Sequence, residues 1–66
     1  MRRRTLETHG PITTHPAGLP DVVLTAMRQS LGPRPLARDI EVHVEPSLEQ
    51  TIGGPQAYDI TVGWSE

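Results

Sequence analysis

Two stretches in the second half of the chain alternate strictly between apolar and polar residues, and they constrain the fold more than any other feature. The first covers residues 39–45, Asp-Ile-Glu-Val-His-Val-Glu, and the second covers residues 58–64, Tyr-Asp-Ile-Thr-Val-Gly-Trp. A period of two that is carried by β-branched and aromatic residues is typical of strands with one buried face. We therefore predict two half-buried strands over 39–45 and 57–64.

The connection between these stretches indicates how they pair. Pro46 ends the first stretch, and Gly53, Gly54 and Pro55 precede the second. Parallel strands need a crossover of about a dozen residues or more, so a connection this short favours antiparallel pairing. Ser47 and Gln50 fit a capping box, which predicts one helical turn over 48–52. The apolar sides of the two strands would form one buried face: Ile40, Val42, Val44, Tyr58, Ile60, Val62 and Trp64.

A helix is predicted over residues 20–31. Pro20 and Asp21 suit the first turn, because proline lacks the N–H that is unpaired there and the carboxylate faces the positive end of the helix dipole. Gly32 and Pro33 form a strong stop signal. The spacing of three, four and seven places four apolar residues on one face: Val23, Leu24, Met27 and Leu31. Val22 and Ala26 would widen that face, and Thr25, Gln29 and Ser30 would point outward.

The first twenty residues hold weaker signals. Residues 3–8 tolerate extended geometry and predict a third strand, which a second copy of the chain could supply instead. Residues 9–20 contain so many proline and glycine residues that we expect an irregular connection. We expect residues 1–19 to form an arm that is flexible or is ordered by a partner.

These elements predict an α+β fold, with one amphipathic helix packed on a small antiparallel sheet in a single domain over residues 1–66. A chain of 66 residues buries only about 60 % of its unfolded surface, so we expect self-association or a partner to stabilise it. The sequence has no cysteine, which excludes disulfides and thiolate chemistry. No stretch reaches the roughly 20 apolar residues of a membrane span, and no apolar run follows Met1–Arg4, so we expect a cytoplasmic protein.

Charge is segregated along the chain. Arg2, Arg3 and Arg4 form a basic run, whereas the rest of the chain holds all eight acidic residues against the three remaining arginines. An acidic body argues against a folded nucleic-acid-binding surface. The basic run leaves a weaker alternative, in which a short N-terminal arm binds nucleic acid through phosphate contacts.

The polar side of the two strands is the most concentrated chemistry in the sequence. Asp39, Glu41 and Glu45 share one strand side, on which residues two apart are separated by roughly 6.6 Å, and Asp59 lies on the other strand. Such a face could imitate a polyanion and occupy a basic channel. In size and charge only, the chain resembles the small acidic inhibitors that phages encode, the anti-CRISPR proteins among them. The alternative is an ordinary solvated strand face, which also protects a sheet edge from aggregation.

Tyr58 and Trp64 are the two aromatic residues, and both types are favoured at interfaces. Trp64 fits either the core or a partner-facing patch. We therefore expect a non-catalytic interaction protein, an inhibitor or an accessory subunit, that binds a larger protein or complex through the acidic residues and these aromatic residues. We predict no catalytic residues and no cofactor, because no nucleophile or phosphate-binding motif is present.

A second hypothesis is a homo-oligomeric module for a small ligand or a metal, in which self-association creates a pocket with His43 and Trp64 at its wall. His43 is flanked by Glu41 and Glu45, which offers nitrogen and oxygen ligands. His9 and His15 do not show a recognised zinc spacing. Because a solvated strand face with one histidine explains the pattern better in a chain without cysteine, we predict no metal site.

Overall fold

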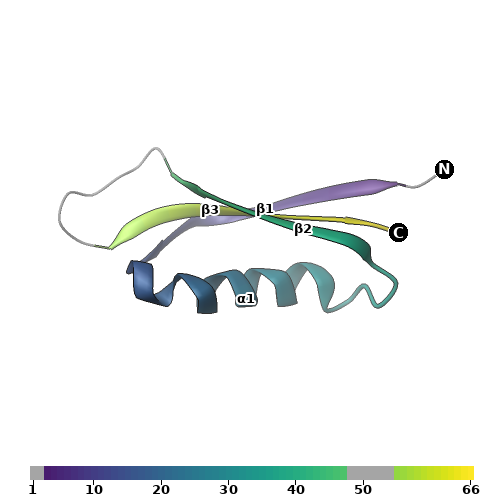
Figure 1. Ribbon diagram of the computed structural model, residues 1–66, viewed down its shortest axis with the longest axis horizontal. Coiled ribbons are helices and arrows are strands. Elements are labelled where there is room, and N and C mark those ends of the chain that lie inside the picture. The colour runs from purple at the N-terminus through teal and green to yellow at the C-terminus, as the bar shows by residue number, and fades with distance from the viewer. Residues whose placement is uncertain (1–2, 48–54) are drawn as a thin grey trace.

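The computed structural model describes residues 3–47 and 55–66 and shows one helix beneath a twisted antiparallel sheet (Figure 1). The sheet has three strands in the order β1-β3-β2. The predicted α+β fold is confirmed. The elements are β1 (Arg4–Thr14), a 3-10 turn (Pro16–Gly18), α1 (Leu19–Leu31), β2 (Arg38–Pro46) and β3 (Gln56–Ser65). Within the described ranges, no helix is long and apolar enough to cross a membrane. The helical turn predicted over 48–52 lies outside the described residues.

Strand β1 is longer than its sequence indicates. The third strand expected over residues 3–8 continues to Thr14 and pairs with β3 throughout, apart from a register shift between His9 and Ile12. The irregular connection expected over 9–20 was therefore wrong for residues 9–14. Over residues 4–14, the segment expected as an arm is a strand of this chain's own sheet.

The register shift accommodates the two residues that argued against a strand. Pro11 has no N–H, but it lies on an edge strand, where one side of the backbone needs no partner. Gly10 has a φ of +148°, and a Cβ there would lie 2.5 Å from Oδ1 of Asp59 and 2.8 Å from the carbonyl oxygen of Tyr58. Only glycine fits this close approach of β1 to β3 without strain.

The core is thin and centres on β3, the strand with neighbours on both sides. Its helix-facing residues Ile60, Val62 and Trp64 are fully buried, and Ala26 of α1 packs on them. Around this cluster lie half-buried apolar side chains: Ile12, Val22, Val23, Met27, Leu31, Ala37 and Val42. Each buried aliphatic side chain contributes about 1.5–3 kcal/mol, so a core of this size leaves little reserve of stability.

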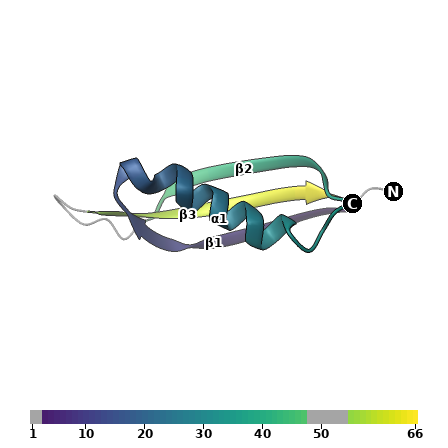
Figure 2. The same ribbon diagram turned by 90° about the horizontal axis from the view of Figure 1, so that it is seen from below.

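Helix α1 is rotated from the orientation that its apolar spacing predicts. Ala26 and Ser30 face the sheet and are buried, whereas Leu24, expected on the buried face, is 45 % exposed. The prediction was wrong for Leu24 and Ser30. Small side chains let the helix approach closely, and the serine hydroxyl finds polar partners on β1. Figure 2 shows α1 crossing the sheet obliquely, and it packs against β1 and β3.

This placement of the helix leaves β2 partly uncovered. We predicted that Ile40, Val42 and Val44 would all be buried, but Ile40 is 46 % exposed and Val44 is 38 % exposed. Of the three, only Val42 packs on the core cluster. The sequence pattern correctly predicts the strand and the side that faces the helix layer, but the helix is too narrow to cover all strands.

Trp64 belongs to the core, with none of its surface exposed. Its Nε1 donates a hydrogen bond to Oε1 of Glu66 over 3.2 Å. The guanidinium carbon of Arg34 lies 4.6 Å from the centre of the indole ring. Arg34 also donates to the carbonyl oxygen of Ser30 in the last turn of α1. These contacts close one end of the core and join the helix, the following loop and β3.

Candidate interaction surface

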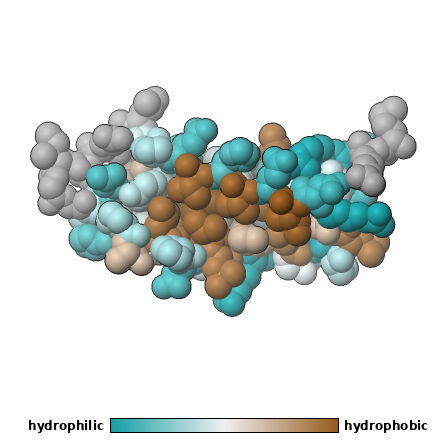
Figure 3. Space-filling view, viewed as in Figure 1, coloured by the Kyte–Doolittle hydropathy of each residue, from teal (hydrophilic) through white to brown (hydrophobic). Residues whose placement is uncertain are grey.

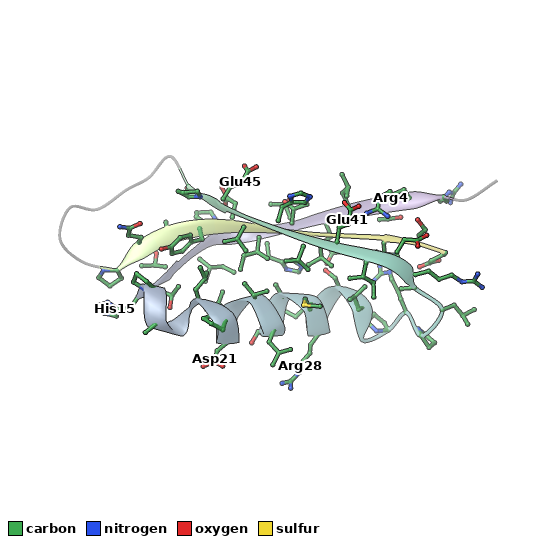
Figure 4. The ribbon with its side chains drawn as sticks, in the orientation of Figure 1. Arg4, His15, Asp21, Arg28, Glu41 and Glu45 are labelled. Atoms are coloured by element: carbon green, nitrogen blue, oxygen red, sulfur yellow. The ribbon has the colours of Figure 1, made fainter. Side chains whose placement is uncertain are left out.

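The side of the sheet that faces away from α1 carries most of the residues singled out from the sequence. We call this side the outer face, and Figure 4 shows Arg4, Glu41 and Glu45 projecting from it, opposite the helix. The strand register arranges this face in rows that run across β1, β3 and β2 in that order. The first row is Leu6, Gly63 and Glu41, and the second is Thr8, Thr61 and His43. The third row holds Asp59 of β3 and Glu45 of β2. The outer face consists of Arg4, Leu6, Thr8, Glu41, His43, Glu45, Asp59, Thr61 and Gly63.

One end of the outer face is neutralised by an arginine that crosses the whole sheet. Arg4 starts on edge strand β1, and its Nη2 lies 3.1 Å from Oε2 of Glu41 on edge strand β2. Its Nη1 donates to the carbonyl oxygen of Asp39 over 3.0 Å and to Oγ of Ser65 over 3.3 Å. The sequence assigns Arg4 to a basic arm, whereas the structure places it among the acidic residues.

Gly63 makes this crossing possible. It occupies the central strand between the two edges, and a Cβ there would lie 3.1 Å from Nη2 of Arg4 and 2.7 Å from Cδ2 of Leu6. The missing side chain leaves room for both residues to lie over β3. Beside them is a shallow depression of about 390 Å³, lined by Arg4, Leu6, Glu41, His43, Glu45 and Thr61.

The other end of the outer face keeps its negative charge. Glu45 and Asp59 are direct neighbours across β2 and β3. Cβ atoms of such pairs lie about 4.5–5.5 Å apart, and like charges in this position destabilise a sheet. Asp59 is half-buried beside Gly10, which limits how far its carboxylate can move away. The outer face is therefore polarised, with an ion pair at one end and two adjacent carboxylates at the other.

The other residues that we expected to bind a partner lie elsewhere. Asp39 has a φ of +50° and sits at a register shift between Arg38 and Glu41, outside the regular rows. Tyr58 and Trp64 are buried on the helix side of the sheet. The structure thus brings together Glu41, Glu45 and Asp59 and separates them from both aromatic side chains. A partner-facing position for Trp64 is wrong for this structure, because the ring is enclosed.

The basic run is divided. Arg2 lies outside the described residues. The backbone carbonyl of Arg3 accepts a hydrogen bond from the amide of Glu66 over 3.3 Å. Arg4 is bound to Glu41, so its side chain lies over the sheet and does not extend from it as part of an arm.

Metal chemistry has little support. In the part of the chain that the structure describes, no group of three or more His, Cys, Asp or Glu residues is placed to hold a metal ion. Nε2 of His43 lies 3.7 Å from Oε2 of Glu41, an oxygen that Arg4 also contacts. His43 belongs to the outer face and Trp64 to the buried face, so the pocket wall expected from these two residues does not form within one chain.

A polar network between β1 and α1 was missed from the sequence. Oγ of Ser30 lies 2.6 Å from Nε2 of His9 and donates to Oε1 of Glu7 over 2.8 Å, and Glu7 Oε1 lies 3.2 Å from the same nitrogen. This is no hydrolytic triad, since Ser30 is fully buried and both partners meet the same ring nitrogen. Extending the period of two beyond residue 8 would have placed Glu7 and His9 on the inner side.

Comparison of the chain with protein-family models, curated proteins and solved structures finds no match. Function must therefore be argued from the geometry of the chain itself. The outer face is the surface on which sequence pattern and structure converge, because three of the four predicted acidic residues meet there.

Proposed function

We propose that the chain is a non-catalytic interaction module that binds a larger protein or complex through the outer face. The observation that carries this proposal is the Glu45–Asp59 pair on a sheet face that α1 does not cover. An ordinary solvated face needs charge, but it does not need two carboxylates opposite each other. Such a pair lowers the stability of the free chain, and a cationic group of a partner would relieve the repulsion.

The partner's chemistry follows from the arrangement of charge. A partner would place arginine or lysine side chains against Glu45 and Asp59 and an apolar group against Leu6, which is 65 % exposed. Proteins that bind nucleic acid present such basic surfaces, and carboxylates can take the place of phosphates there. We propose that the chain acts in the cytoplasm as an inhibitor or accessory subunit, in the manner of a phage-encoded nucleic-acid mimic.

The polar groups that resemble catalytic machinery support a role without catalysis. Ser30 is fully buried between β1 and α1, which leaves a substrate no access to its hydroxyl. The depression on the outer face is shallow, and one of its carboxylates is already bound to Arg4. Catalytic carboxylates usually need a concave and partly dry site.

Charge reversal of one residue tests this proposal. Glu45→Lys places a cation opposite Asp59, so the fold is retained while the acidic end is lost. The matched control is Asp21→Lys, which changes net charge equally but lies on α1, away from the outer face (Figure 4). Wild type and both variants would be used to capture partners from the producing cells, with quantitative mass spectrometry at several salt concentrations.

We expect the wild type and Asp21→Lys to retain the same partner and Glu45→Lys to lose it. We also expect wild-type binding to weaken as salt rises, because screened charges hold the complex. Equal retention of one partner by Glu45→Lys and the wild type would contradict the proposal.

A further inference from the structure

The edge formed by β2 differs from the edge formed by β1. Among residues 3–47 and 55–66, sheet order leaves one side of the β2 backbone without a neighbouring strand. The helix-side residues of β2 are apolar, and Ile40 and Val44 remain exposed because α1 packs against the other two strands. An open backbone edge beside exposed aliphatic side chains is the arrangement that promotes strand pairing with another chain.

Strand β1 does not share this character. Pro11 and the register shift beside it interrupt the β1 edge. The helix-side residues Glu7 and His9 are polar and are bonded to Ser30. On β2, the register shift between Arg38 and Glu41 lies near the start and Pro46 at the end, so residues 41–45 form an uninterrupted edge of roughly 17 Å.

The apolar surface continues from β2 onto the helix. Figure 3 shows apolar residues gathered over α1 and β2 on the side of the molecule where β2 forms the edge. Leu24 is exposed there. A hollow of about 490 Å³ lies along the same helix, lined by Pro16, Leu19, Pro20, Val23, Leu24 and Met27. The open edge and this surface together offer backbone hydrogen bonds and apolar contact to one occupant.

We propose that this occupant is a second copy of the chain, paired antiparallel through β2 with the two-fold axis at Val42. The sheet would then continue across both copies, with both helices on the same side. In this register Val42 faces its own copy, Ile40 comes opposite Val44 of the other copy, and Glu41 faces His43 of the other copy. Asp39 comes opposite Glu45, but its φ of +50° at the register shift places it outside the regular rows of the strand. Aliphatic side chains meet on the helix side, and an imidazole meets a carboxylate on the outer side.

Neighbouring registers lack this complementarity. Centring on His43 places Glu41 opposite Glu45, and centring on Glu41 places that residue opposite itself. Each brings like charges together, which destabilises a strand pair. A slip by an odd number of residues places the apolar side of one copy opposite the polar side of the other. Among the registers centred on Glu41, Val42 and His43, the one centred on Val42 therefore avoids like charges within the regular rows of β2.

This proposal does not depend on the proposed function, because it uses the β2 edge, the helix side and, from the outer face, only Glu41 and His43, whereas the proposed function rests on the Glu45–Asp59 pair. Pairing would leave the Glu45–Asp59 end of each copy accessible and would place the two outer faces side by side. The thin core of the single chain gives a physical reason for association, since small scaffolds gain stability by oligomerising.

The absence of cysteine permits a direct test of the register. Val42→Cys places one thiol at the proposed axis, where directly opposed Cα atoms lie about 4.5–5.5 Å apart, within the range of a disulfide. The matched control is Leu6→Cys, which places an exposed thiol on the other edge strand. Both variants would be oxidised under identical mild conditions, and the covalent dimer would be measured on a non-reducing gel.

The wild type would be examined by sedimentation equilibrium from micromolar to millimolar concentration, together with Ile40→Lys. Ile40 is exposed in the single chain, so this substitution spares the fold. We expect the wild type to form a dimer. We expect Ile40→Lys to raise the dissociation constant of the dimer at least about 100-fold, because the dimer loses two aliphatic contacts and each loss raises that constant about tenfold. We expect covalent dimer from Val42→Cys at several times the yield from Leu6→Cys.

A wild type that stays monomeric at every concentration would overturn the proposal. This outcome would also be seen if β2 pairs with a strand of another protein rather than with a second copy. A dimer that Ile40→Lys does not weaken would place the interface elsewhere. Equal cross-linking of the two cysteine variants would overturn the register.

Discussion

The stability of the fold should depend strongly on Arg34, which joins the end of α1 to the ring of Trp64. Its guanidinium lies over the ring of Trp64 and donates to the carbonyl oxygen of Ser30 at the end of α1. Replacing it with alanine removes both contacts and uncovers the largest side chain of the core. Replacing it with methionine retains an apolar stem over the ring and removes only the charge and its hydrogen bond.

The magnitude follows from the geometry. A cation over an indole ring contributes about 0.5–1 kcal/mol at a partly exposed site. The hydrogen bond from the guanidinium to a helix carbonyl adds about 1 kcal/mol. This is less than the roughly 1.5–3 kcal/mol of a buried hydrogen bond to a charged group, because the Arg34 side chain is 34 % exposed. We expect Arg34→Met to lower the free energy of unfolding by about 1.5 kcal/mol, the sum of these two contributions, and Arg34→Ala by about 2 kcal/mol, because the apolar stem is lost as well. A domain of this size has roughly 3–10 kcal/mol in total, so the loss is large.

Urea unfolding followed by far-UV circular dichroism measures the change. Trp64 is the sole tryptophan, so its fluorescence independently reports the opening of this end of the core. A loss of about 2 kcal/mol lowers the melting temperature by about 8–16 °C. An unfolding free energy for Arg34→Ala within about 0.5 kcal/mol of the wild type would refute the role assigned to these contacts.

Three further predictions follow from single contacts. Ser30→Ala should lower the unfolding free energy by about 1–2 kcal/mol in urea titrations, because a buried hydroxyl that bridges His9 and Glu7 is lost; an unchanged midpoint would contradict the network. Glu45→Lys should raise stability by about 0.5 kcal/mol by ending the repulsion with Asp59, and the gain should shrink in 1 M salt; a loss would show that the carboxylates do not repel. Gly10→Ala should destabilise by about 1–3 kcal/mol, because its positive φ and the close backbone of β3 exclude a Cβ; a melting temperature equal to the wild type would exclude this close approach.

The sequence predicts the strands well because their period of two is local. Residues 39–45 and 57–64 repeat apolar side chains at every second position, and both segments form strands with bounds within one residue of those expected. The helix is likewise set by local signals, with proline in the first turn and glycine at the end. These features depend on neighbours in the chain rather than on the packing of distant elements.

Features that depend on packing could not be predicted in this way. Ser30 was expected to point outward because serine is polar, but the polar side of β1 supplies its partners. Ile40 was expected to be buried because it alternates correctly, yet the helix covers other strands. Burial depends on where the helix crosses the sheet, which the periodicity of either element does not specify.

The candidate surface shows the same contrast between features that follow from local sequence and features that depend on packing. Alternation correctly predicts that Glu41, Glu45 and Asp59 share one face. The position of Arg4 was missed, since its contact with Glu41 requires the strand order β1-β3-β2 and a glycine on the central strand. Neither is a local property. The result is a polarised face rather than the uniformly acidic one that the sequence indicates.

Methyl NMR of the chain titrated with a captured partner tests the central claim most directly. Leu6 lies on the outer face and Leu24 on the helix, and both are exposed in the free chain. Binding through the outer face predicts that the Leu6 and Thr61 methyl signals shift while the Leu24 signals stay in place. Shifts at Leu24 with Leu6 and Thr61 unchanged would contradict the claim and place the partner on the helix side.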